Sequence, residues 1–167
     1  MAVTIVATAK STTANSYVTL AEAEAYITGR TGNATWDAAS TDTKNRALVE
    51  STNRLEQEEY DGVQTTTTQR LQWPRDGLVD KAGNGYDKDV IPRPVKEATH
   101  EMALALVNGD LELKDTGLEG YKNIKIGPMD VTPNNSRRAG TLPAAVKRLL
   151  SYLRLGSSDM NVHTVRG

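Results

Sequence analysis

Apolar positions recur along most of this chain at the three- and four-residue spacing of amphipathic helices. The first stripe of this kind follows Thr19 and Glu22, which have the spacing of a capping box. It predicts a helix from residue 20 to about residue 27 that ends at Gly29 or Gly32. Its buried positions would be Leu20, Ala23 and Ile27.

A second stripe predicts a longer helix that starts at Ser40 or Thr41 and runs to about Glu59. Trp36 lies just before this helix, and we expect its indole to cover the start of the helix. The inner face is only weakly apolar, which favours partial burial or packing against a neighbouring subunit. That face consists of Ala47, Leu48, Ser51, Thr52 and Leu55.

Two prolines, Pro92 and Pro94, open the third predicted helix, where a missing amide donor costs nothing. Apolar residues then recur at helical spacing as far as Asn108–Gly109, and glycine is common just after a helix end. The inner face consists of Val95, Ala98, Met102, Ala105 and Leu106.

The segment between the second and third helices, residues 61–90, has no sustained period and is rich in turn-forming residues, which predicts a long irregular loop. Between residues 121 and 133 the apolar period changes to two, on either side of Gly127–Pro128. This alternation predicts a β-hairpin. Its apolar positions are Ile124, Ile126, Met129 and Val131.

A last stripe predicts a helix that Thr141 caps, with Pro143 in its first turn and Gly156 at its end. The polar residues after Gly156 are typical of a tail that has no structure until a partner orders it. The apolar positions of this helix are Val146, Leu149, Leu150 and Leu153.

These elements predict a mainly α fold, a compact bundle of about four helices with a long central loop, a small β-hairpin and an extended C-terminal tail. The expected organisation is an N-terminal arm over 1–16, one helical domain over 17–156 and a tail over 157–167. A chain of 167 residues suits a single domain. Only 5% of the residues are aromatic, so the core must be aliphatic and alanine-rich, which favours helices over a β-sandwich.

The absence of cysteine excludes a disulfide framework, a thiolate zinc site and a cysteine nucleophile. No apolar run reaches the length that spans a bilayer, and the N-terminus lacks a basic and then apolar signal sequence. We therefore expect a soluble protein that stays in a cytoplasm-like compartment and has no membrane partner.

Charge is unevenly distributed along the chain. Residues 1–119 carry 12 Lys/Arg against 19 Asp/Glu, a charge of −7, whereas residues 120–167 carry 8 against 2, a charge of +6. An acidic body with a basic C-terminal third can attract a second copy of itself, an acidic partner or nucleic acid. A solvated surface without a partner is the alternative.

Candidate catalytic residues do not form a known constellation. His100 and His163 have no carboxylate at metal-ligand spacing beside them, so a helix or core histidine is the expected role of His100. The run from Gly83 to Gly85 lacks the third glycine and the lysine of a phosphate-binding loop. Acidic residues are scattered, without a pair whose environments would separate their pKa values. We expect neither an enzyme nor a cofactor or metal site.

Trp73 stands before a proline in the central loop, in the run RLQWPRDG. It would plug the loop onto the helical core, anchor a neighbouring subunit, or stack on a base. Base stacking would bring phosphates towards the aspartates that follow, and Pro74 favours an extended, fixed Trp73. These features favour the plug, with Leu71, Pro74, Arg75 and Pro92 as further structural anchors.

Three stretches, ANSYVTLAEAEAYITGR at 14–30, QRLQWPRDG at 69–77 and VIPRPVKEATHEMALAL at 90–106, resemble a phage protein family. The family carries the label DnaT-like single-stranded-DNA-binding and is similar in layout to the head-to-tail connector, or adaptor, proteins of tailed phages. The resemblance covers about residues 14–155. The signature positions are Asn15, Tyr17, Gln69, Leu71, Trp73, Pro74, Arg75, Ile91 and Pro92.

The resemblance to adaptors implies a structural virion protein, a subunit of a head-completion ring under the portal that continues the DNA channel to the tail. The implied partners are further copies of the chain in a ring, a dodecamer to match the portal, then the portal itself, a tail or stopper protein, and double-stranded DNA that passes without sequence-specific contact. The implied location is the virion neck, after assembly in the bacterial cytoplasm. The alternative function is a single-stranded-DNA-binding module of DnaT-like type.

Basic residues in the C-terminal third are the candidates for portal or subunit contacts. A solvated helix face is the other interpretation of their charge. These residues are Arg137, Arg138, Lys147, Arg148 and Arg154, together with the 157–167 tail.

Overall fold

A computed structural model describes residues 3–109, 124–126, 129–131 and 142–154. The fold is mainly α-helical, as predicted, with five helices in the described ranges where the stripes predict about four. The helices are α1 (Leu20–Thr28), α2 (Ala34–Ala38), α3 (Thr41–Leu55), α4 (Arg93–Val107) and α5 (Ala144–Leu150). The strands are β1 (Val63–Gln64), β2 (Arg75–Asp76), β3 (Ile124–Ile126) and β4 (Met129–Val131).

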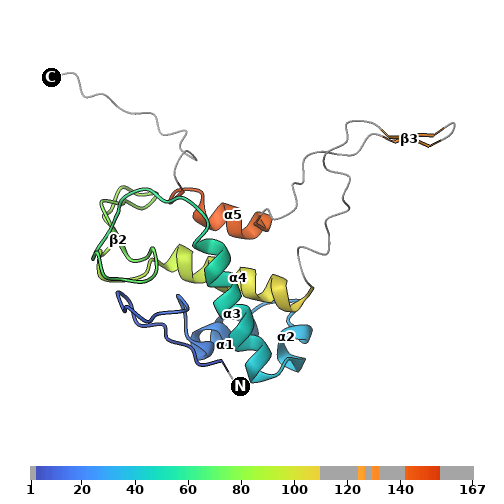
Figure 1. Ribbon diagram of the computed structural model, residues 1–167, viewed down its shortest axis with the longest axis horizontal. Coiled ribbons are helices and arrows are strands. Elements are labelled where there is room, and N and C mark those ends of the chain that lie inside the picture. Colours follow the sequence, from blue (N-terminus) through green and yellow to red (C-terminus); the bar gives the residue numbers. More distant parts are fainter. Residues whose placement is uncertain (1–2, 110–123, 127–128, 132–141, 155–167) are drawn as a thin grey trace.

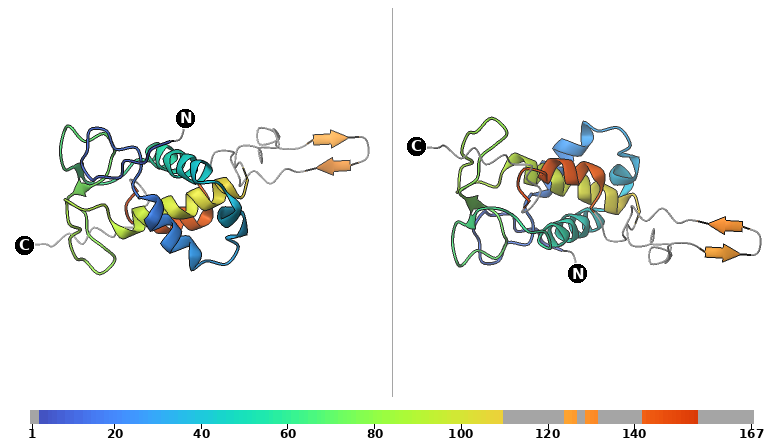
Figure 2. Two further views of the ribbon diagram at one scale, coloured as in Figure 1. Left: turned by 90° about the horizontal axis from the view of Figure 1, so that it is seen from below. Right: turned by 90° about the horizontal axis from the view of Figure 1, so that it is seen from above.

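Helix α4 lies at the centre of the molecule, and α1, α2, α3 and α5 all pack against it (Figure 1). The two views in Figure 2 show α3 and α1 on different sides of α4, with α5 alongside. Because neighbours surround it, α4 buries side chains on more than one face, and small residues let the other helices approach. Its buried residues are Val95, Ala98, Thr99, His100, Glu101, Met102, Ala103 and Leu104.

The predicted capping box of α1 and the predicted start of α3 are confirmed. Thr19 and Glu22 form both hydrogen bonds of the capping box of α1, and the Ser40 hydroxyl accepts from the Thr43 amide at the start of α3. The predicted inner face of α3 is buried along its whole length. We expected Trp36 to cover the start of that helix. It belongs to the short helix α2, and its side chain is buried.

Helix α3 ends at Leu55, earlier than the predicted Glu59. The chain turns there because the hydroxyl of Tyr60 folds back and donates to the Leu55 carbonyl at 2.9 Å. That bond satisfies one of the acceptors that every helix end leaves open. The bond itself spans five residues, but the Tyr60 ring that makes it packs against Trp73 of the loop, and the helical period alone does not reveal this boundary.

The central loop contains a small antiparallel sheet that the sequence pattern does not predict. Val63 pairs with Asp76 and Gln64 with Arg75. Strands of two residues are too short to show a period. Gly62 precedes β1 with a φ of +73°, and a Cβ there would lie 2.4 Å from the Asp76 carbonyl oxygen.

The predicted β-hairpin is present as the pair β3–β4, in which Ile124 lies opposite Val131 and Ile126 opposite Met129. Helix α5 begins after Pro143, so that proline caps the helix and does not lie inside its first turn. The predicted cap Thr141, the predicted end Gly156 and the 157–167 tail lie outside the described residues.

One apolar core joins all five helices and the central loop. From α5 and the turn after it, Val146, Leu150 and Leu153 reach this core. Within the described ranges, no helix has the length and apolar character needed to cross a bilayer. The 1–16, 17–156 and 157–167 boundaries remain a prediction.

Candidate functional site

The indole of Trp73 lies inside the protein, with 1% of the residue's surface exposed. The ring of Tyr60 packs edge-on against it, with centroids 5.2 Å apart and an interplanar angle of 70°. Leu71 is buried beside it, and the Trp73–Pro74 peptide bond is cis. A nucleobase cannot reach this ring, so its position agrees with the plug interpretation and not with base stacking.

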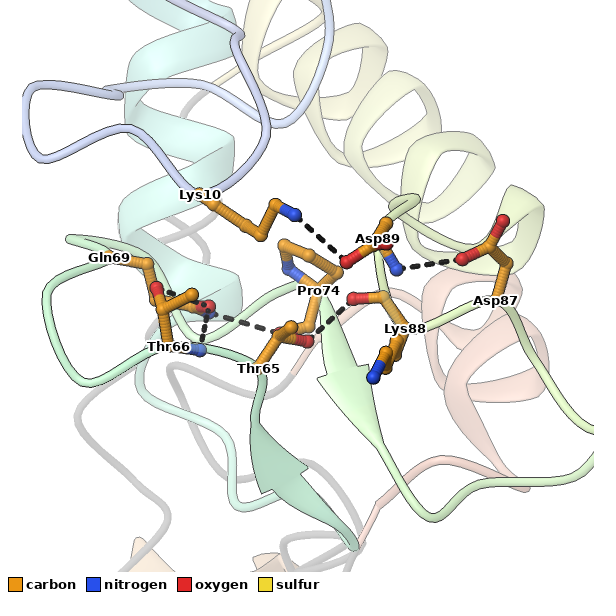
Figure 3. Close-up of polar contacts among 8 residues, drawn as sticks. All are labelled: Lys10, Thr65, Thr66, Gln69, Pro74, Asp87, Lys88 and Asp89. Carbon is orange, nitrogen blue, oxygen red and sulfur yellow. Dashed lines mark hydrogen bonds and ion pairs between the residues drawn. The ribbon is translucent and has the colours of Figure 1, made fainter.

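Gln69 bonds to the loop backbone on both sides of Trp73, and Figure 3 shows it beside Thr66 and Pro74. Its side-chain amide donates to the carbonyls of Leu71 at 2.8 Å and Pro74 at 3.0 Å, while its Oε1 accepts from the Thr66 amide at 3.1 Å. The Thr65 amide also donates to the Pro74 carbonyl, at 3.3 Å. Buried backbone acceptors therefore have partners within the loop, as burial requires.

Arg75 organises the chain that leaves α3. Its Nε donates to the carbonyl of Asp61 at 2.7 Å, and its Nη2 donates to those of Tyr60 at 3.1 Å and Gly62 at 2.7 Å. Partial burial lowers the pKa of Arg75, while the carboxylate of Glu56 acts in the opposite direction. The guanidinium thus serves three successive backbone oxygens of its own chain.

The N-terminal arm is tied to the same loop (Figure 3). Lys10 forms an ion pair with Asp89, with 2.8 Å between Nζ and Oδ1. The Thr65 hydroxyl donates to the Lys88 carbonyl at 2.5 Å, and the Asp89 amide donates to the Asp87 carboxylate at 2.8 Å. These contacts fix the stretch that leads into α4.

Glu56 connects three segments at the end of α3. Its carboxylate accepts the Tyr17 hydroxyl from the segment that joins the arm to α1, and the Gln72 amide from the loop, the latter at 2.9 Å and 3.1 Å to its two oxygens. Burial raises the pKa of Glu56 to about 6, although the Gln72 hydrogen bond acts in the opposite direction.

Every signature residue is therefore buried or bonded within its own chain. Asn15 shows the pattern, because its side chain donates to the Thr4 carbonyl and accepts from the Val6 amide, each at 2.8 Å. Pro92 precedes the first turn of α4 as its N-cap. The signature residues therefore stabilise the fold. A binding surface would have to consist of other residues.

The basic residues predicted as contacts fall into three groups. Lys147 and Arg148 are exposed on α5. Arg154 instead forms an ion pair with Glu58 of the loop and a backbone bridge with Tyr60, so it closes the molecule on itself. Arg137 and Arg138 lie outside the described residues, as does the 157–167 tail.

Tyr152, in the turn after α5, is a surface residue that the sequence analysis missed. Its exposed fraction is 54%, and the ammonium of Lys81 lies 4.5 Å from the ring centroid. The sequence does contain a signal for it: Arg148 and Tyr152 are four residues apart, and the helical period continued past Leu150 puts both opposite the apolar stripe. These residues from α5 and the central loop form a basic and aromatic surface.

His100 lies between α4 and α1, with its ring centroid 4.7 Å from that of Tyr26. Neither ring nitrogen has a hydrogen-bond partner among the described residues, and burial lowers the pKa of His100 to about 4. Beside it, Glu101 accepts from the Tyr26 hydroxyl at 2.8 Å and from Arg30 at 2.9 Å. Burial and this carboxylate raise the pKa of Tyr26 to about 12. His100 is a neutral core residue.

Among the described residues, no group of three or more His, Cys, Asp or Glu side chains is arranged to hold a metal ion. A hollow of about 240 Å³ opens between α3 and the end of α4, and no nucleophile stands next to a base in its lining. It is lined by Thr43, Arg46, Ala47, Glu50, Leu106 and Val107.

Comparison with known protein families gives a match over the whole chain. The whole chain, residues 1–167, matches the family described as "Putative DnaT-like ssDNA binding protein". No curated protein and no solved structure matches. The match supports the DnaT-like part of the resemblance and does not extend to the phage connector identity.

Proposed function

Because this chain belongs to the DnaT-like ssDNA-binding family, we propose that it is a non-catalytic module that binds single-stranded DNA. The observation that carries the proposal is the family match, which covers every residue of the chain. The family description names single-stranded DNA as the ligand, which was the alternative function in the sequence analysis.

The surface chemistry supports the same proposal. Nucleic-acid affinity comes mainly from cations that neutralise phosphates, and Lys147 and Arg148 are exposed on α5. Their side chains belong to the part of the chain that carries the positive charge, whereas the body is acidic. Trp73 and the other signature residues contribute indirectly, since they hold the loop that lies beside α5.

The test is binding of a fluorescent single-stranded oligo(dT) measured by anisotropy, with a duplex hairpin of equal charge as the comparison. We expect preference for the single strand and an affinity that falls steeply between about 50 mM and 200 mM salt. Affinity that is equal for both ligands would point to charge attraction alone. Absence of binding at about 50 mM salt would contradict the proposal.

A second candidate function is the head-to-tail adaptor, a structural virion protein. The placement of the signature favours it, because residues such as Trp73 and Gln69 build a scaffold and present no base-reading group. In this proposal the protein forms a dodecameric ring in the virion neck, assembled in the bacterial cytoplasm, between the portal and a tail or stopper protein. Double-stranded DNA would pass through its channel, and no membrane takes part.

The adaptor proposal is tested by mixing the purified protein with portal rings and examining the mixture by electron microscopy. A ring added beneath the portal supports it, and charge reversal at Lys147 and Arg148 should then weaken the docking. A protein that binds oligo(dT) but leaves the portal bare would support DNA binding instead.

A further inference from the structure

The aromatic rings of the described residues differ sharply in their access to solvent. Trp36, Trp73, Tyr17 and Tyr60 are buried, with exposed fractions of 5% or less. Tyr152, at 54%, is the single aromatic residue among the exposed large hydrophobic residues of the described ranges. A ring that stacks on an unpaired base must be accessible, which makes Tyr152 the candidate in this part of the chain.

Positive charge surrounds this ring. The Lys81 ammonium lies 4.5 Å from the ring centroid, and Arg148, on α5, precedes Tyr152 by four residues, about one helical turn. Both cations are exposed. Because the Lys81 ammonium lies over the ring, a base would have to stack on the other face of Tyr152, with Arg148 about one helical turn earlier in the chain.

Two carboxylates near the surface, those of Glu58 and Asp80, are bound to groups of this chain. Glu58 forms an ion pair with Arg154. Asp80, the residue before Lys81, accepts the amides of Ala82 at 2.8 Å and Asn84 at 2.9 Å within its own turn. Because Asp80 keeps its negative charge, the strand should approach from the α5 side, where Arg148 lies.

We propose that Tyr152, Arg148 and Lys81 form the surface that binds single-stranded DNA, with a base stacked on the Tyr152 ring and phosphates paired with the two cations. The inference rests on the proposed DNA-binding function and gives it a location. It also predicts a preference for single strands, because a base in a duplex cannot leave its neighbours to stack on a protein ring without unpairing.

The experiment measures anisotropy of labelled oligo(dT) with the full chain and three variants at Tyr152 and a control position. We expect Tyr152→Ala to lower affinity by about 5- to 150-fold, the range for loss of one stacked base. Tyr152→Phe keeps the ring and should stay within about twofold of the parent protein. The control is Val90→Ala, which truncates an exposed apolar residue (51%) away from the ring.

The cations are tested through the salt dependence. Arg148→Gln and Lys81→Gln should each lower the slope of log affinity against log salt by about 0.7, the value for one phosphate contact on a single strand. Circular dichroism of each variant checks the fold, which substitution of exposed side chains should leave intact.

The possible results of these experiments distinguish the proposed surface from the proposed DNA-binding function. A parent protein that does not bind oligo(dT) overturns the DNA-binding proposal and this surface together. A parent protein that binds, with Tyr152→Ala equal to it, overturns only the surface. If Tyr152→Ala leaves DNA affinity unchanged and alters the sedimentation of the protein alone, the ring is a protein contact and the inference is wrong.

Discussion

At the scale of single residues, Trp73 has the largest expected effect on stability. Replacing a buried tryptophan by alanine removes its apolar contacts and leaves a cavity, at a cost of about 3–5 kcal/mol. We expect Trp73→Ala to lower the free energy of unfolding by this amount, a large share of the total for a domain of this size. Chemical denaturation followed by circular dichroism measures it.

Two further variants show how the loss of stability depends on the burial of the ring. Trp73→Phe retains an aromatic ring against Tyr60 and should cost less than the alanine variant. Tyr152→Ala removes an exposed ring and should change stability by less than about 0.5 kcal/mol. Equal losses for Trp73→Ala and Tyr152→Ala would show that burial does not set the cost.

The pKa of His100 predicts a dependence of stability on pH. Its pKa is about 4 in the folded protein and 6.5 in the unfolded chain, so the unfolded chain binds the additional proton between these values. Its contribution is present in full above pH 6.5 and is lost as the pH falls towards 4. Glu56 acts oppositely, because its raised pKa makes folding bind a proton between about pH 4.5 and 6.

Comparison with His100→Leu isolates the histidine, because Glu56 is the same in both proteins. From pH 7 to pH 4, the parent should lose up to about 3 kcal/mol of unfolding free energy relative to the His100→Leu variant. A difference that stays constant over this range would mean that His100 remains solvated, contrary to its burial between α4 and α1.

At the scale of elements, the small β1–β2 sheet depends on Gly62. Its φ of +73° disfavours any other residue, and a Cβ would lie 2.4 Å from the Asp76 carbonyl oxygen, so β2 would have to move. Gly77 has a similar φ of +83° with nothing within 4 Å of an added Cβ, which makes it a matched control.

We expect Gly77→Ala to cost about 1 kcal/mol, the penalty of the left-handed conformation. Gly62→Ala should cost clearly more, because the clash adds to the same penalty. Thermal unfolding of the two variants measures the difference. Similar melting temperatures would show that the β1–β2 pair yields to the added methyl group without cost.

Helices and strands differ in how far local sequence specifies them. The capping box of α1 and the prolines of α4 act within one turn, so their positions follow from the residues alone. The end of α3 does not, because the Tyr60 ring, whose hydroxyl reaches the last carbonyl of α3, packs against Trp73 of the distant loop. Strands β1 and β2 are too short for a period and exist because Arg75 and Gln69 order the loop around them.

At the scale of the whole molecule, the central loop and the helices share one core, so they should unfold together. The two tryptophans test this, because Trp36 lies in α2 and Trp73 in the loop. Trp36→Phe leaves fluorescence from Trp73 alone, and Trp73→Phe leaves it from Trp36 alone. Within each variant, the fluorescence and circular dichroism transitions should have the same midpoint.

A loop that opens separately would give a different result. The Trp73 fluorescence in the Trp36→Phe variant would then change at a lower denaturant concentration than the helical signal. Such a result would contradict the network in which Glu56 joins Tyr17, α3 and the loop.

The sequence by itself determined the helical class, the caps, the inner face of α3, the hairpin and the charge division, because these depend on local spacing and composition. It also contained the family resemblance that the whole-chain match supports. Only the tertiary structure decided that Trp73 is enclosed, that Arg154 turns inward to Glu58, and that Lys81 meets Tyr152. Exposure and pairing depend on which distant segments pack together, and spacing along the chain does not contain that information.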